Sequence, residues 1–482
     1  MPSLISLDVT KSIQKTIGHS TQESWVDKVT FALLILTIEA KSERRKTTAM
    51  GGLSKKIGLL NHLGAGNLGD DATLDAVIEN IKKRWPFSEI VAFSMNPSDT
   101  QTRHGVPAYP IRIETWNRAA RSAPSGVALK TKIKADLSKL PLIGPIGEAI
   151  DKVLIRTLRT FVEELHFLGG SRRILRSLDL FIISGGGQLL DSWGGPWKFP
   201  YTLFKWVVLA RLSGVRCKFV NVGAGPLRYR LSKWFVKRAL FLAEYVSFRD
   251  EVSRKLIRQI GFNGRSHVLP DCAYSLAIPR CLIHRDKPSE GAIVAFSPMA
   301  YRDPRVYWEK DQQMYDRFIQ TMATFGCWLS QQRCHLTLLS TDFLFDAQSI
   351  EDLKARLKAE NVGPGHLRHE PVTTFEEIVS ELSSVDYVVT CRFHGVVFAH
   401  MLNKPVLALS HHPKVSTLMN DLGLARYCVD IRECNQAMLE ETFTDMVNKH
   451  DEIKTRMSEK LQDYRKQLST QFDRLFGVEA TA

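Results

Sequence analysis

Arg392 and His394 stand two residues apart, directly after the apolar run 387–389. A guanidinium binds a carboxylate or phosphate through paired hydrogen bonds, and an imidazole titrates near neutral pH and can move a proton. Together they suit an anionic substrate that must be both held and protonated. For an isolated pair, a helix-capping arginine and a packed histidine are the alternative, but the surrounding chain favours the functional interpretation.

A strand, a turn and a helix are predicted to position this pair. The run 387–389 is apolar and β-rich, Gly395 allows close backbone approach, and the apolar spacing from Val396 onward is helical. In an open α/β sheet, ligands bind at the carboxyl ends of the strands, where helix N-termini present free N–H groups. The pair is therefore expected at a ligand-binding edge of a sheet.

A glycine-rich turn is expected at the same kind of edge. It follows the predicted strand 56–60 and has the spacing GxGxxG over residues 64–69. The next residues, Asp70 and Asp71, would repel the pyrophosphate of a dinucleotide, so the match to that motif is weak. Either carboxylate is expected to cap the helix predicted at 72–84 or to bind a sugar hydroxyl.

A second glycine loop is more specific than the first. Gly185, Gly186 and Gly187 come directly after the buried strand predicted at 178–184. Three successive glycines after an apolar strand indicate that a ligand or another backbone segment approaches closely.

Strands, loops and helices alternate through two long stretches that a polar, proline-containing linker separates at 276–290. This alternation predicts an α/β protein with two Rossmann-like domains. The predicted units are an N-terminal extension (1–54), a first Rossmann-like domain (55–275) with a basic helical insertion (119–176), a second Rossmann-like domain (285–434) and a C-terminal helical tail (435–482) that packs back across both domains.

The chain has 482 residues and a formal net charge of +14. Basic charge of this size suits anionic partners and says nothing about fold. Because aromatic and basic residues are not interleaved, and because zinc-finger spacing and a helix-turn-helix pattern are absent from the sequence, nucleic acid is not an expected partner. The basic segment 119–176 is interpreted as a helix pair covering the sheet, with contact to an anionic membrane surface as the alternative.

Cysteine usage indicates a reducing compartment. The eight cysteines form no CxxC pair, a pattern typical of free thiols in the cytoplasm, and neither a metal ion nor a cofactor is expected.

The apolar stretch 29–38 is about half as long as a membrane span. Since residues 1–54 differ from the rest, Met50 is a candidate initiator, with a genuine helical extension as the alternative.

Seven short motifs occur in one order between about residue 56 and residue 430. They are Gly66-Asn-Leu-Gly-Asp70, Ser184-Gly-Gly-Gly-Gln188, Gly223-Ala-Gly-Pro226, Ser247-Phe-Arg-Asp250 with Ser253, Leu269-Pro-Asp271, Arg392-Phe-His394 with Phe398-Ala399, and Pro413-Lys414. On these motifs the chain resembles the polysaccharide pyruvyl transferase family. It departs from the family pattern at Cys272, where proline is usual, and at Asp191, to which the acidic residue after the glycines has shifted.

The resemblance implies a two-domain fold like that of GT-B glycosyltransferases, with domains that face each other across a cleft containing the active site. Family members are similar in moving an enolpyruvyl-derived unit from phosphoenolpyruvate onto sugar hydroxyls. The product is a pyruvate ketal on a cell-surface or secreted polysaccharide precursor. Expected partners are therefore phosphoenolpyruvate and a sugar or lipid-linked oligosaccharide, in the cytoplasm or at the inner face of its membrane.

The same resemblance, with the chemistry of the donor, suggests roles for the charged residues. Phosphoenolpyruvate carries a carboxylate and a phosphate, so its site needs several fixed cations. His394 is expected to be the general acid/base, Arg392 to clamp the donor carboxylate or phosphate, and Lys414 to bind the phosphate. Arg249 is either a further donor-binding cation or the ion-pair partner of Asp250.

Backbone and acceptor contacts are expected from the other motifs. The glycines expected to bring backbone N–H groups to the donor or acceptor are Gly185, Gly186 and Gly187. The expected acceptor-binding residues are Asn67, Asp70 and Asp271. Capping is the alternative for Asp271. His411 and His412 are predicted to be exposed loop histidines, with a contribution to the site beside Lys414 as the alternative.

Two other functions compete with this interpretation. A nucleotide-sugar glycosyltransferase of the same fold would usually carry a carboxylate pair or a metal-binding acidic motif, and an Arg-x-His turn is less expected there. A non-catalytic scaffold at a membrane assembly would depend on the basic segment 119–176.

Overall fold

The computed structural model describes residues 54–61, 66–113, 162–192, 194–282 and 291–477. The predictions for the N-terminal extension, for Met50 and for most of the basic segment 119–176 lie outside these residues. The part of that segment that is described, residues 162–176, is helical.

Seven parallel strands form the sheet of the N-terminal lobe, in the order β3-β2-β1-β4-β5-β6-β7. They are β1 (Lys56–Leu60), β2 (Glu89–Ser94), β3 (Ala108–Pro110), β4 (Leu180–Ser184), β5 (Arg216–Val222), β6 (Tyr245–Phe248) and β7 (His267–Val268). Strand β4 is buried at every residue, as expected for a parallel sheet whose two faces are covered by helices.

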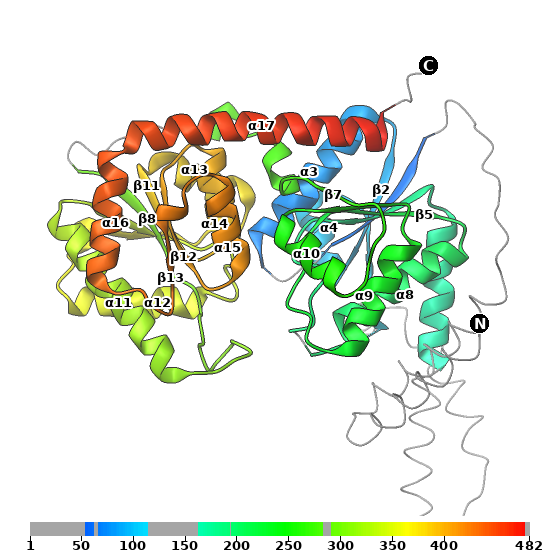
Figure 1. Cartoon of the computed structure of the whole chain (residues 1–482), viewed down its shortest axis with the longest axis horizontal. Coiled ribbons are helices and arrows are strands. Elements are labelled where there is room, and N and C mark those ends of the chain that lie inside the picture. Colours follow the sequence, from blue (N-terminus) through cyan, green and yellow to red (C-terminus); the bar gives the residue numbers. More distant parts are fainter. Residues whose placement is uncertain (1–53, 62–65, 114–161, 193, 283–290, 478–482) are drawn as a thin grey trace, which may run out of the picture.

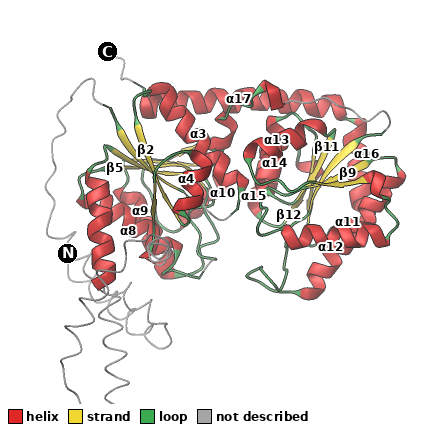
Figure 2. Cartoon of the chain, turned by 180° about the vertical axis from the view of Figure 1, so that it is seen from behind, coloured by secondary structure: helices red, strands yellow, loops and turns green. Residues whose placement is uncertain are grey.

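The helices of the N-terminal lobe cover this sheet on both faces (Figure 2). They are α3 (Leu68–Arg84), α4 (Pro97–His104), α8 (Phe199–Leu212), α9 (Arg230–Leu242), α10 (Glu251–Gln259) and the short η1 (Cys272–Ser275) and η2 (Arg280–Leu282). Trp206 of α8 is fully buried and packs against Phe93 of β2, with ring centroids 4.8 Å apart. Large aromatic side chains thus fill the space between sheet and helices.

A six-stranded parallel sheet forms the C-terminal lobe, in the order β10-β9-β8-β11-β12-β13. Its strands are β8 (Ile293–Ser297), β9 (His335–Leu338), β10 (Leu367–His369), β11 (Tyr387–Thr390), β12 (Val406–Ser410) and β13 (Cys428–Asp430). Its helices are α11 (Gln312–Gln331), α12 (Ala347–Ala359), α13 (Phe375–Ser384), α14 (Phe393–Met401) and α15 (Pro413–Asp421), with the short η3 (Pro364–His366) and η4 (Ala425–Tyr427).

The C-terminal tail consists of α16 (Gln436–Asn448) and the long α17 (His450–Phe476), which runs across both lobes (Figure 1). Near its start, Met457 O lies 2.8 Å from Nε2 of His400 in the C-terminal lobe. Near its end, Gln471 Nε2 donates to Asn221 Oδ1 in the N-terminal lobe, at 2.7 Å. Helix α17 therefore fastens the two lobes together.

The structure corrects two predicted boundaries in the N-terminal lobe. Helix α3 begins at Leu68 rather than at 72, because Asn67 caps it and accepts hydrogen bonds from the N–H groups of Gly69 and Asp70. Neither Asp70 nor Asp71 caps the helix; both lie in its first turn. Strand β3 ends at Pro110 instead of continuing to 113.

No helix in the described part of the chain is both long and apolar enough to cross a bilayer. All eight cysteines are unpaired.

Candidate active site

Each sheet reverses its strand order at one point, between β1 and β4 in the N-terminal lobe and between β8 and β11 in the C-terminal lobe. In open α/β sheets, ligands bind outside the carboxyl ends of the strands at such points. The segments that follow these strands are the turn before α3, the glycines 185–187, the loop 298–311 and the Arg392–His394 turn. Topology thus places the start of α3, the glycines 185–187, Arg392 and His394 where a ligand is expected, whereas Arg249, Asp271 and Lys414 follow the strands β6, β7 and β12.

The two lobes touch at this place. Leu68 N donates to Thr341 O at 2.8 Å, and Phe343 N donates to Gly66 O at 3.1 Å. Asn67 and Asp342 form an antiparallel bridge between these bonds. The start of α3 is therefore docked onto the segment after β9, and we call this contact region the interlobe junction.

His394, the predicted general acid/base, lies in the junction against Gly69. It is the second residue of α14 and is 7% exposed. A Cβ atom added to Gly69 would lie 1.7 Å from Nδ1 of His394, so the imidazole rests directly on the backbone of α3. Glycine at position 69 is thus required for the ring to occupy this place.

The imidazole is neutral and has an unused nitrogen. Its Nε2 is buried, lies 3.9 Å from Asp271 Oδ2, and makes no hydrogen bond within the described residues. Burial lowers the pKa of His394 to about 4; Asp271 opposes this shift, and the cations Arg249 and Lys414 add to it. A buried, unpartnered ring nitrogen is suited to exchange a proton with a ligand.

Arg249 reaches from the end of β6 into the junction. Its guanidinium lies 4.2 Å from the ring centroid of Phe393, in the other lobe, and 3.4 Å from Asp271 Oδ2. A Cβ on Gly223 would come within 2.7 Å of its Nε, so that glycine leaves room for the side chain. Asp250 is more distant, 3.7 Å from Nε, and caps α10. Arg249 is therefore paired with Asp271 at least as closely as with Asp250.

Lys414 lies in the first turn of α15 rather than in the loop before it. Its Nζ forms no hydrogen bond or ion pair with the described residues. Burial, Arg249 and Arg392 lower its pKa to about 8, against the opposing effect of Asp70. Lys414 is thus a half-buried ammonium group available to an anion.

Arg392, the predicted donor clamp, is already paired with two carboxylates. Its Nε donates to Asp346 Oδ2 at 2.7 Å, and its Nη2 donates to Asp346 Oδ1. Its Nη1 lies 3.3 Å from Asp342 Oδ2. Burial raises the pKa of Asp342 to about 6 despite the opposing charge of Arg392. A ligand anion reaching Arg392 would compete with Asp342, which makes the looser of the two contacts.

Asp70 and Asp271 stand beside this group from the N-terminal lobe. Asp70 is 8% exposed, and its carboxyl has no hydrogen-bond partner among the described residues. Burial and the neighbouring Asp71 raise its pKa to about 7. Asp271 accepts from Ala273 N and from Thr73 Oγ1 as well as binding Arg249, so it caps η1 and orients Arg249 at once.

Two of the three glycines after β4, Gly185 and Gly186, pack against α3, whereas a Cβ on Gly187 would meet only Leu190. A Cβ on Gly185 would lie 1.9 Å from Thr73 Cγ2, and one on Gly186 would lie 2.8 Å from Asp70 Oδ1. The N–H of Gly185 donates to Val220 O. The close approach of α3 thus explains Gly185 and Gly186, and it brings Asp70 to the end of β4.

His411 and His412 are not the exposed histidines that were predicted; both are half-buried. His412 caps α15 by accepting from Lys414 N at 3.2 Å, and burial lowers its pKa to about 4. His411 packs near Tyr301, with ring centroids 6.3 Å apart, and burial lowers its pKa too. The prediction failed because residue 413 starts a helix, which folds the loop inward.

Asp342 and Asp346 were not among the predicted site residues. Asp342 follows the strand predicted at 336–340 and thus lies at the carboxyl edge of its sheet, a signal that was available. Arg103 of α4 was also missed: it bonds Thr373 O across the junction and lies 3.8 Å from Asp71. Within the described chain, no group of three or more His, Cys, Asp or Glu side chains is arranged to hold a metal ion.

A cavity of about 740 Å³ lies elsewhere, at the other ends of α3 and α14. It is lined partly by Lys83, Met401 and Arg465. Lys83 is fourteen residues beyond Gly69, about 20 Å along the helix. This cavity therefore belongs neither to the junction nor to the cluster around His394.

The cluster can bind an anion with proton uptake. Lys414 and Arg249 offer positive charge, while Asp70 and Asp342 are carboxyl groups with raised pKa. A bound anion would repel these carboxylates and favour their protonated forms.

A family model described as polysaccharide pyruvyl transferase matches residues 67–413. The matched interval contains Asp70, Arg249 and His394, and it ends one residue before Lys414. A search of curated proteins found no match.

Solved structures share the fold at low sequence identity. The Anabaena protein HepE, in complex with UDP and glucose, has a TM-score of 0.51 at 12% identity, covering 87% of this chain and 98% of that chain. A putative UDP-N-acetylglucosamine 2-epimerase from Listeria monocytogenes has a TM-score of 0.52 at 9% identity, covering 87% and 94%. The UDP-GlcNAc 2-epimerase from Methanocaldococcus jannaschii has a TM-score of 0.50 at 11% identity, covering 82% and 93%. The predicted GT-B-like arrangement of two α/β domains is confirmed.

Proposed function

The chain belongs to the polysaccharide pyruvyl transferase family, and from this premise we propose that it transfers the pyruvyl unit of phosphoenolpyruvate to two hydroxyls of a sugar. The product is a pyruvate ketal on a polysaccharide precursor, and inorganic phosphate is released. The observation that carries the proposal is the buried, unpartnered Nε2 of His394 beside Arg249 and Lys414.

Donor binding would raise the pKa of His394. The pKa of His394 is about 4, partly because cations surround it. The carboxylate and phosphate of the donor would offset Arg249 and Lys414, so the pKa of the imidazole would rise and the ring would take up a proton. The donor carboxylate would displace Asp342 and bind Nη1 of Arg392 in its place.

The chemistry follows from this protonation. His394 gives its proton to the methylene carbon C3, which becomes a methyl group and leaves C2 as an oxocarbenium-like centre. A sugar hydroxyl attacks C2 and its proton passes to His394 or to Asp70. A second hydroxyl then attacks C2, the bond from C2 to the phosphate oxygen breaks, and phosphate leaves with the electron pair and the second proton. Asn67, Asp70 and Asp271 are the proposed acceptor-binding side chains.

The acceptor is proposed to be a sugar or a lipid-linked oligosaccharide in the cytoplasm. For a lipid-linked acceptor, the basic segment 119–176 would contact anionic lipid. Flotation of the protein with vesicles of phosphatidylglycerol and phosphatidylcholine, with and without this segment, tests that contact. Binding that does not depend on the segment contradicts it.

A donor comparison tests the function. The purified protein is incubated with phosphoenolpyruvate or with UDP-sugars and a panel of saccharides, and released phosphate and the methyl signal of a ketal are followed by NMR. We expect phosphate release and a ketal only with phosphoenolpyruvate. Turnover of a UDP-sugar without ketal formation would instead identify a nucleotide-sugar glycosyltransferase.

A further inference from the structure

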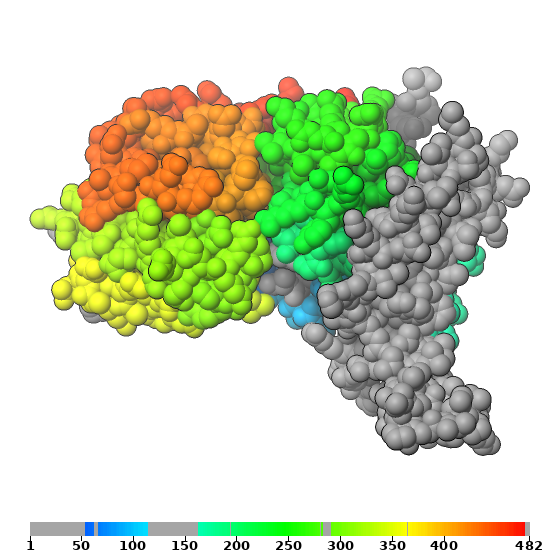
Figure 3. Space-filling view, turned by 60° about the horizontal axis from the view of Figure 1, so that its bottom comes forward, coloured from blue at the N-terminus to red at the C-terminus, as the bar shows by residue number. Residues whose placement is uncertain are grey.

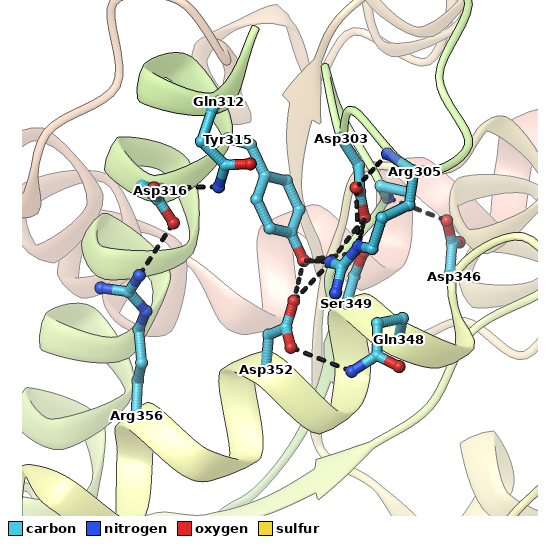
Figure 4. Close-up of polar contacts among 11 residues, drawn as sticks. Asp303, Arg305, Gln312, Tyr315, Asp316, Asp346, Gln348, Ser349, Asp352 and Arg356 are labelled. Carbon is cyan, nitrogen blue, oxygen red and sulfur yellow. Dashed lines mark hydrogen bonds and ion pairs between the residues drawn. The ribbon is translucent and has the colours of Figure 1, made fainter. Parts of the chain in front are cut away.

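The loop 298–311, which follows β8, is held rigidly at its base. Ala300 N donates to Asp346 Oδ1 at 3.0 Å, so the carboxylate that orients Arg392 also fixes this loop. Further along, Arg305 Nε donates to the buried Asp303 at 2.8 Å, and its terminal nitrogen donates to Asp352 at 2.6 Å (Figure 4). The loop therefore presents its side chains from a fixed backbone.

Aromatic rings on this loop lead outward from the site. Tyr301 lies 6.3 Å from His411 and 5.7 Å from Tyr307, centroid to centroid. Tyr307 is buried and stacks on Trp308 with centroids 4.0 Å apart and planes at 21°. Trp308 is 42% exposed. The series thus ends in an indole supported on one face and open to solvent.

The N-terminal lobe contributes a second exposed ring, on the residue that follows the loop-binding Arg228. Arg228 bonds Glu309 of the loop at 2.6 Å, and Arg302 binds the same carboxylate at 3.1 Å. The neighbouring Tyr229 is 53% exposed, and its N–H donates to Asp191 at 3.0 Å. An exposed aromatic residue is thus the sequence neighbour of each partner of this interlobe ion pair: Tyr229 follows Arg228, and Trp308 precedes Glu309. Figure 3 shows the face on which the two lobes adjoin.

This arrangement fits a saccharide better than other partners. The C–H faces of sugar rings are apolar and pack on indole and phenol rings, while their hydroxyls bond charged side chains beside the rings. An apolar protein surface or acyl chain would instead cover Arg228, Arg302 and Glu309 without returning hydrogen bonds to them. Supported aromatic rings also lose little conformational entropy when a ligand binds.

We propose that Trp308 and Tyr229 form a docking platform for the sugar units that adjoin the modified sugar of the acceptor. The proposal rests on the proposed function, because it names where the rest of the saccharide lies when its reacting hydroxyls reach His394. It assigns the enzyme an oligosaccharide acceptor, free or lipid-linked, rather than a single sugar.

The test compares Trp308→Ala and Tyr229→Ala with the matched control Phe87→Ala. Phe87 is 86% exposed and precedes β2, at the edge of its sheet opposite the junction. Binding of each protein to an array of oligosaccharides is measured, and the same glycans coupled to lipid in vesicles distinguish a lipid-linked from a free ligand. Phosphoenolpyruvate binding is measured separately by calorimetry.

We expect each platform variant to bind its glycan about tenfold more weakly in both formats, and Phe87→Ala to bind as the unmodified protein does. Phosphoenolpyruvate affinity and the unfolding temperature should be unchanged in all three. Equal glycan binding by Trp308→Ala and the unmodified protein, or no glycan bound by the unmodified protein, overturns the platform. If phosphoenolpyruvate binds normally in that case, the proposed function stands; if it does not bind at all, the proposed function fails.

Discussion

The imidazole of His394 rests on Gly69, a residue of the opposite lobe. Any side chain at position 69 would occupy the space of the ring, since its Cβ would lie 1.7 Å from Nδ1. The nearest atoms to that Cβ all belong to His394. The position of the proposed acid/base group thus depends on one glycine in the first turn of α3.

Gly69→Ala is expected to abolish most of the activity. The added methyl group displaces the imidazole, and misplacement of a reacting group by about 1 Å can reduce the rate about 100-fold. Ketal formation and thermal unfolding are the measurements. The control is the same substitution in a His394→Ala background, where the ring is absent and the methyl group fits. Equal destabilisation by Gly69→Ala in both backgrounds would show that the clash is not with His394.

His394→Ala alone is expected to reduce ketal formation by about 10²- to 10⁴-fold, the usual contribution of a general acid/base. The fold should persist, because the lost side chain makes no hydrogen bond through Nε2. Circular dichroism and phosphoenolpyruvate binding check that persistence. Near-full turnover by this variant is the result that removes His394 from the mechanism.

Most strands could be predicted from local patterns, although the strand β13 (Cys428–Asp430) and the order of strands in the sheets were not. Strand β6 was predicted with the bounds that the structure shows, because a short apolar run between polar residues suffices to define a buried strand. The start of α3 was predicted wrongly, because its capping residue, Asn67, lies inside a glycine-rich turn where helix and loop patterns overlap. Boundaries of this kind depend on one hydrogen bond rather than on a periodic pattern.

The candidate site was predictable as a set of loops and not as a set of contacts. His394, Arg249 and Asp271 all follow strands, so topology brings them to the carboxyl edges of the sheets. The pairing of Arg392 with Asp346 joins residues 46 positions apart, and no local pattern in the sequence predicts it. The contact between Gly69 and His394 requires the relative placement of two lobes, which a single sequence does not encode in any short motif.

Asp342→Asn is expected to strengthen phosphoenolpyruvate binding several-fold at pH 8. Asparagine keeps the acceptor oxygen that Phe345 N uses but removes the charge that competes for Arg392. Calorimetric titration at pH 8 measures the effect. Arg392→Lys is the contrast: it should weaken binding and lower the unfolding temperature, because a lysine cannot form both bonds to the buried Asp346. Weaker donor binding by Asp342→Asn contradicts the competition.

Donor affinity is expected to fall as pH rises from 6.5 to 8.5. The pKa values of Asp342, Asp70 and Lys414 are about 6, 7 and 8, and all three groups are more positive or less negative at lower pH. A bound anion raises each of these pKa values, so binding takes up protons and weakens as they become scarce. Titrations in buffers of different ionisation enthalpy count the protons taken up. Proton release on binding would contradict the assignment.

Asp70→Asn is expected to raise stability while lowering activity. The pKa of Asp70 is raised from 3.8 to about 7 in the folded protein, so between these pH values the folded state binds more protons than the unfolded state. Stability therefore falls as pH rises through this range, and the full cost is present above pH 7.

The neutral asparagine removes that cost and should raise the free energy of unfolding at pH 8 by on the order of 1–3 kcal/mol, while lowering ketal formation. Asp71→Asn is the matched control from the same helical turn. Asp71→Asn removes a charge that raises the pKa of Asp70. The curve of activity against pH for this variant should therefore keep its shape and shift to lower pH. Chemical unfolding at pH 5 and pH 8 measures stability, and no gain at pH 8 in Asp70→Asn means that the carboxyl is not strained by its surroundings.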